Sequence, residues 1–134
     1  MRGHGNYLNS TMNNSDLIEL EKKKSKLITG MRDYMNDEDE DFDPGYTEAD
    51  IQKCDKILME FLDNLQKLRR DATQPEILAF VKIVVLELNK LNESVGHGLI
   101  ETGQREDLCD YILYAASHSG LKTAEDVTEE WREW

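Results

Sequence analysis

The densest group of residues that could bind a cation lies between Asp37 and Asp50. Eight acidic residues and no basic residue give this stretch a local charge of −8. Part of it has the spacing of a twelve-residue calcium loop, in which side-chain oxygens are needed at positions one, three, five and twelve. Asp37, Asp39, Asp41 and Glu48 occupy those four positions. The pattern therefore makes this stretch a candidate calcium site.

Two other positions of this loop do not suit tight calcium binding. Position six needs a left-handed backbone that glycine adopts best, but the residue there is Phe42. Position eight normally has a free N–H group, but Pro44 has none. No second loop is present to pair with the first. We therefore predict a solvated acidic linker that binds divalent cations weakly and is not an ordered calcium site. Its ligands would be Asp37, Asp39, Asp41, Asp43 and Glu48.

A second candidate begins at Gly96-His97-Gly98 and continues to Arg105. Glycines allow a backbone to approach a ligand closely, and the start of a helix offers free N–H groups to an anion. His97 could act as an acid or a base. No other His, Cys or nucleophilic Ser has a spacing that would complete a catalytic set. We expect a turn between two helices with an exposed histidine, and a small polar site at His97 and Arg105 is the alternative.

The third candidate is the end of the chain, where two tryptophans stand within four residues. Thr123 and Asp126 resemble a capping box, and Val127, Trp131 and Trp134 then share one face of a short helix. We expect this helix to fold back on the protein and to bury most of Trp131. The alternative is that one indole stays exposed as an anchor for a binding partner, because Trp is favoured at the centre of interfaces. The residues of that partner site would be Trp131, Trp134, Glu129, Glu130, Glu133 and Asp126.

A further group of carboxylates, Glu106, Asp107 and Asp110, lies on the preceding helical segment. Carboxylates from several helices can hold two metal ions, but the known helical arrangement also needs Glu-x-x-His pairs, and the sequence has none. We identify no catalytic residue and predict no metal ligand and no cofactor.

The elements that must position these residues are helices. Apolar residues recur at helical spacing in four long segments, most of them preceded by a residue that caps helices well. Ser15 and Thr47 are the first two predicted caps, and Thr73 forms a capping box with Glu76 around Pro75. The predicted helices span residues 15–36, 47–70, 74–94 and 103–119. The third is the most apolar, so we expect it at the centre.

This pattern predicts an all-α protein, an antiparallel four-helix bundle with a short C-terminal fifth helix. Residues 1–14 are rich in Gly, Asn and Ser and have no periodicity, so we expect a disordered tail there. Residues 15–134 would then form a single helical domain. Cys54 and Cys109 are far apart and form no metal-binding pair, and with no secretory signal we expect reduced thiols in a cytoplasmic protein.

Charge narrows the range of partners. The chain of 134 residues has a net charge of −12. Nucleic acids and anionic membranes would be repelled, because binding to them depends on Lys and Arg. A basic protein would be attracted. We therefore expect a protein–protein interaction module for a basic partner, for example an inhibitor or immunity-type protein. The alternative is a metal-dependent or small-molecule helical enzyme that uses the clustered carboxylates.

Overall fold

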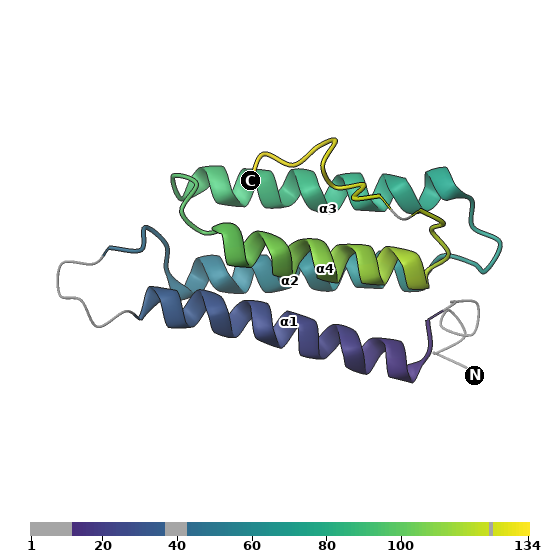
Figure 1. The fold of residues 1–134 in the computed structure, drawn as a ribbon, viewed down its shortest axis with the longest axis horizontal. Coiled ribbons are helices and arrows are strands. Elements are labelled where there is room, and N and C mark those ends of the chain that lie inside the picture. The colour runs from purple at the N-terminus through teal and green to yellow at the C-terminus, as the bar shows by residue number, and fades with distance from the viewer. Residues whose placement is uncertain (1–11, 37–42, 124) are drawn as a thin grey trace.

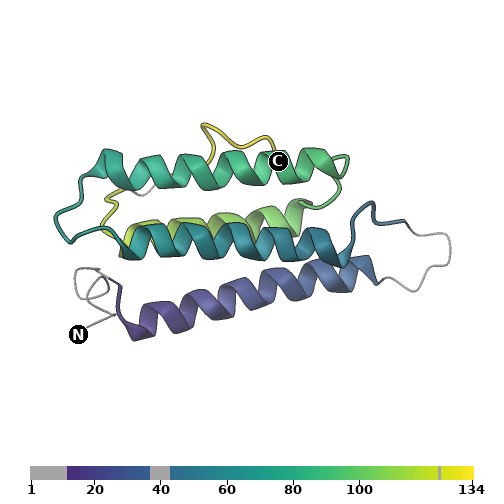
Figure 2. The same cartoon turned by 180° about the vertical axis from the view of Figure 1, so that it is seen from behind.

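The computed structural model describes residues 12–36, 43–123 and 125–134, and within them it contains four helices and no strand. The helices are α1 (Asn14–Met35), α2 (Glu48–Gln66), α3 (Gln74–Ser94) and α4 (Thr102–His118). Figures 1 and 2 show the helices side by side, with successive helices running in opposite directions. α1 packs chiefly on α4, and α2 packs chiefly on α3. The predicted all-α helical bundle is confirmed.

The first helix begins earlier than predicted, and its cap is Asn13 where we predicted Ser15. The Asn13 side-chain oxygen accepts the Asp16 N–H at 2.9 Å, and the Asp16 carboxylate accepts the Asn13 N–H at 3.0 Å. This reciprocal pair requires an acid three residues after the cap, and Ser15 is followed at that distance by Ile18. Met12 is buried in the core. Order thus extends into the predicted tail, whose residues 1–11 lie outside the described residues.

The predicted caps of α2 and α3 are confirmed, but the end of α2 is not. The Thr73 N–H donates to the Glu76 carboxylate at 2.9 Å, and the Glu76 N–H donates back to the Thr73 hydroxyl at 3.3 Å. α2 ends at Gln66 and not near residue 70. The Leu68 N–H bonds the carbonyl of Leu65, three residues back, which tightens and closes the last turn.

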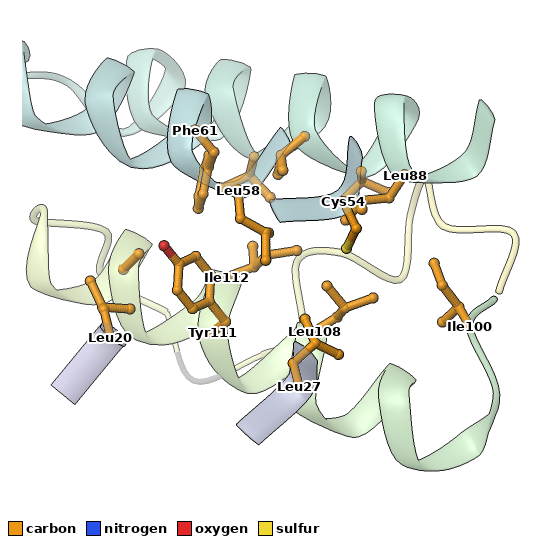
Figure 3. Close-up of a cluster of buried hydrophobic side chains, with 14 of the residues drawn as sticks. Leu20, Leu27, Cys54, Leu58, Phe61, Leu88, Ile100, Leu108, Tyr111 and Ile112 are labelled. Atoms are coloured by element: carbon orange, nitrogen blue, oxygen red, sulfur yellow. The ribbon is translucent and has the colours of Figure 1, made fainter. Parts of the chain in front are cut away.

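The core lies between all four helices, and α3 is not at its centre as we predicted. Figure 3 shows Leu27 of α1, Leu58 of α2, Leu88 of α3 and Leu108 of α4 converging on one cluster, and all four are fully buried. In both overall views α2 and α4 lie between α1 and α3. α3 therefore forms one edge of the bundle, and its Ile83 remains 45% exposed. α3 is nevertheless the most apolar helix, because one face packs on the core and another is covered by the end of the chain.

The loops at one end of the bundle fix where α4 begins. The buried Asn92 side chain accepts the N–H groups of Leu99 and Ile100 at 3.1 and 3.0 Å. Gly98 lies against the preceding α1–α2 loop, where an added Cβ would stand 3.2 Å from the Pro44 carbonyl oxygen. A larger residue at position 98 would push the two loops apart.

The predicted fifth helix is wrong. Residues 127–131 form a turn, and 132–134 have no regular structure. The Arg132 N–H bonds the Thr128 carbonyl at 2.9 Å, which is a single helical turn. A continuing helix would direct the Glu133 N–H to the carbonyl four residues back, but this N–H donates to Asn89 of α3 at 3.0 Å. A contact with a distant helix therefore replaces the helical hydrogen bond.

Candidate functional site

The C-terminal segment, residues 125–134, is held on α3 by hydrogen bonds to the Asn89 side chain. Figure 1 shows this end of the chain crossing α3. Asn89 is 6% exposed, and its side-chain nitrogen donates to the Trp131 carbonyl at 2.8 Å. Its side-chain oxygen accepts the Glu133 N–H at 3.0 Å. One buried amide thus binds the backbone at two alternate residues of the segment.

A second group of contacts fastens the segment to α4. Thr128 is fully buried, and its hydroxyl oxygen lies 3.5 Å from the sulfur of Cys109 on α4. The Asp126 carboxylate accepts the N–H and the hydroxyl of Thr128 and pairs with Arg132 at 3.2 Å. Desolvation raises the pKa of Asp126, but the hydrogen bonds from Thr128 and Arg132 outweigh it and hold the pKa below its usual value. Asp126 is therefore an ionised carboxylate that already has its cation.

The segment and the first half of α3 enclose an open groove of about 690 Å³. Its α3 side consists of Pro75, Leu78, Ala79 and Lys82. The side formed by the segment consists of Glu125, Asp126, Val127, Glu129, Glu130 and Trp131. Leu78, Val127 and Trp131 are half-buried and pack on the core, so they make an apolar floor. Three exposed glutamates stand around this floor, and we call the whole feature the acidic groove.

The glutamates of the acidic groove differ from the acids that α2 and α4 direct at α1. Acids on α2 and α4 pair with bases of α1, for example Asp55 with Lys24 at 3.0 Å and Asp110 with Lys23 at 2.8 Å. Within the part of the chain that the structure describes, Glu125, Glu129 and Glu130 form no ion pair. Their charges are thus open to cations from another molecule.

The structure divides the partner site that we predicted at the C-terminus. Asp126, Glu129, Glu130 and Trp131 line the acidic groove, whereas Trp134 and Glu133 lie outside it. Trp131 packs on the core and is only partly exposed, as expected, although it lies on a turn at the groove and not inside a helix. The Arg132 guanidinium lies 5.8 Å from the centre of the Trp134 ring, which is also half-buried. The fully buried residue of the segment is Thr128.

Sequence reasoning missed the α3 side of the groove and the role of Asn89. One signal was present, because Asn89 is a polar residue next to Leu88 on the buried side of the most apolar helix. A polar group at such a position needs a hydrogen-bond partner. Leu78, Ala79 and Lys82 carry no comparable signal, because ordinary helix residues become a groove wall only when another segment lies beside them.

The structure does not join His97 and Arg105, the second candidate site, into one polar site. His97 is exposed in the loop before α4 with a φ of 65°, and its N–H donates to the Asn92 carbonyl at 2.8 Å. Arg105 is half-buried on α4, near enough to Cys109 for its charge to act on that thiol. Among the described residues no hydrogen bond or ion pair joins His97 to Arg105. The expected exposed histidine in a turn is confirmed.

Most of the acidic loop lies outside the described residues, including Asp37, Asp39 and Asp41. Asp43 accepts the N–H of Gly45 at 2.9 Å. Glu48 accepts hydrogen bonds from the Arg32 guanidinium, the shortest at 2.7 Å, and from Gln52. Hydrogen bonding from Arg32 and then from Gln52 lowers the pKa of Glu48 to about 2. Glu48 is therefore engaged in the helix contact, while weak cation binding by the loop stays a prediction.

Two of the three α4 carboxylates, Asp107 and Asp110, pair with bases of α1, whereas Glu106 is exposed. Asp107 pairs with Lys26 at 3.4 Å, and Asp110 pairs with Lys23 at 2.8 Å. In residues 12–36, 43–123 and 125–134, no group of three or more His, Cys, Asp and Glu side chains is placed to hold a metal ion. None of the helices in these ranges has both the length and the apolar content needed to cross a membrane.

Comparisons with protein-family models, with curated proteins and with solved structures give no match to this chain.

Proposed function

We propose that this protein is an interaction module that binds a basic protein through the acidic groove. The observation that carries the proposal is the combination of an apolar floor with three exposed glutamates that have no cation of their own. An apolar floor gains free energy when a partner covers it. Acidic groups at the edge attract basic partners over a distance and repel acidic ones.

The half-buried Trp131 strengthens this proposal. Tryptophan is enriched among the few residues that dominate the free energy of protein interfaces, and such residues usually lie near the centre of the contact. Trp131 lies in the groove, its backbone is held by Asn89, and glutamates stand beside it at positions 129 and 130. A partner would thus meet an aromatic group that is already ordered, which lowers the entropic cost of binding.

The net charge of −12 supports the same class of partner. One concrete form is a stoichiometric inhibitor or immunity-type protein, in which acidic groups cover the surface that a basic enzyme uses to bind phosphate. In this proposal the protein acts in the cytoplasm and binds neither nucleic acid nor an anionic membrane.

A selection from a random peptide library tests the proposal. We expect peptides that bind the full chain to be rich in Lys and Arg, and to lose affinity steeply as salt is added, because salt screens exposed charges. The double variant Glu129→Gln/Glu130→Gln should lose most of this binding. The matched control is Glu93→Gln/Glu133→Gln, which removes the same charge from exposed positions outside the groove. Selected peptides that are neutral or acidic, or equal losses in both variants, would contradict the proposal.

A further inference from the structure

We infer that the acidic groove selects a short partner segment in which one large apolar side chain stands between two cationic side chains. This inference rests on the proposed function and specifies what the partner must present. It follows from three features of the groove, namely its length, the acids that line it beside the apolar floor, and the base on its α3 side.

The length of the groove limits the occupant to a short segment. On α3 the lining residues Pro75, Leu78, Ala79 and Lys82 follow one another at spacings of three, one and three. They therefore form one stripe along the helix, roughly 10 Å long at ~1.5 Å per residue. An extended chain covers that distance with about three residues. The volume of about 690 Å³ falls within the range of ordinary ligand sites, about 300–1,000 Å³. A large side chain and its two neighbours fit these limits.

Acids line the groove together with its apolar floor and favour cations next to an apolar side chain that occupies it. Glu125 precedes Val127 in the segment, and Glu129 and Glu130 follow it. All three acids line the same groove as Val127 and Trp131. A partner whose apolar side chain contacts Val127 and Trp131 would bring its neighbouring side chains to these acids. Lysine or arginine at both neighbouring positions satisfies this pattern.

Lys82 makes the two walls of the groove differ in charge. Among the residues that the structure describes, it is the only base that lines the groove. It is exposed and belongs to the α3 side. Its charge disfavours a third cation at that wall, because like charges brought together without a counterion repel each other. The groove therefore distinguishes a segment with separated cations from a uniformly basic one, which an acidic patch alone would not do.

Three synthetic peptides of equal length test the inference by calorimetry on the full chain. The first has Phe between two lysines, the second has Ser in place of Phe, and the third has glutamates in place of the lysines. Burying a Phe side chain contributes about 1.5–3 kcal/mol, so the Phe peptide should bind at least about tenfold more tightly than the Ser peptide. The glutamate peptide should not bind.

Variants identify the site. Ala79 is exposed and lines the groove, so Ala79→Trp should fill it and abolish the preference for Phe while the Ser peptide binds as before. Ala49→Trp is the matched control, because Ala49 is an exposed alanine of α2 that lies outside the groove. The double variant Glu129→Gln/Glu130→Gln should weaken both lysine peptides by a similar factor. Circular dichroism of each variant shows that it has folded.

The outcomes separate this inference from the proposed function. If both lysine peptides bind equally and Ala79→Trp changes neither, the inference is overturned while a basic partner remains supported. If the Phe peptide binds more tightly but Ala79→Trp and Ala49→Trp act alike, the apolar contact is elsewhere and the inference is also overturned. If neither lysine peptide binds, the inference and the proposed function fail together.

Discussion

The buried amide of Asn89 donates a hydrogen bond of 2.8 Å to the carbonyl oxygen of Trp131, which lies 42 residues later in the chain. The same amide accepts the Glu133 N–H. This contact positions the wall of the acidic groove that the C-terminal segment forms. Without it, the segment would be held mainly by Thr128 and by the packing of its apolar side chains.

Replacing Asn89 should therefore loosen the segment. Asn89→Ala removes both hydrogen bonds and leaves two partly buried backbone groups without their partner, so we expect a loss toward the lower end of about 1–3 kcal/mol in the free energy of unfolding. Denaturant unfolding measures this loss, and tryptophan emission should shift toward that of a solvated indole. Asn64→Ala is the control, because Asn64 is a half-buried asparagine of α2 with no hydrogen bond from its side chain among the described residues. Equal effects of the two substitutions would contradict the role of Asn89.

The thiol of Cys109 should report whether the segment is docked. Thr128 and Asp126 contact this thiol, and burial raises its pKa despite the hydrogen bond to Thr128. Alkylation requires the thiolate and access to it. We expect slow modification by iodoacetamide in the native protein and clearly faster modification in Asn89→Ala, followed by mass spectrometry of peptides.

Cys54 provides the internal reference in the same experiment. It is completely buried, and burial raises its pKa to about 12. It should react only through unfolding of the whole bundle. If Cys54 and Cys109 react at the same rate, the segment does not open separately from the rest of the protein.

The two tryptophans should contribute similarly to stability. Removing a fully buried Trp costs about 3–5 kcal/mol, but Trp131 and Trp134 are both half-buried. We expect Trp131→Ala and Trp134→Ala each to lower the free energy of unfolding by roughly half that amount. Only Trp131→Ala should also weaken binding of the Phe peptide, because Trp134 lies outside the groove. A large loss of stability for Trp131→Ala alone would contradict the expectation of similar contributions.

Acid should weaken the contact between Glu48 of α2 and Arg32 of α1. Hydrogen bonding from Arg32 lowers the pKa of Glu48 to about 2, below its value in the unfolded chain. A lowered pKa stabilises the fold above the unfolded pKa of about 4.3, and this contribution is lost as the pH falls toward 2. The difference in stability between the wild type and Glu48→Gln should therefore shrink across this range. Unfolding midpoints measured at successive pH values test this, and a constant difference would contradict it.

The local features of the helices could be predicted from the sequence. The cap formed by Thr73 and Glu76 involves residues three apart, and helical spacing places Leu58, Leu88 and Leu108 on buried faces. Such patterns depend only on residues that are close in the chain, so the predictions made from them were confirmed. The error at Ser15 was also local, because Asn13 has an acid three residues later for a reciprocal cap and Ser15 does not.

The C-terminal segment could not be predicted in this way. Its sequence pattern is that of a short helix, yet Asn89 of α3 binds the Glu133 N–H, and Asp126 bonds Thr128 and Arg132. The acidic groove likewise needs Leu78 and Val127 on opposite sides, 49 residues apart. Helix caps and apolar stripes are encoded within a few residues, so the sequence by itself determined the four helices. Only the tertiary structure decided the path of the segment and the groove, because a buried hydrogen-bonding group on a distant helix outweighed the local preference for another helical turn.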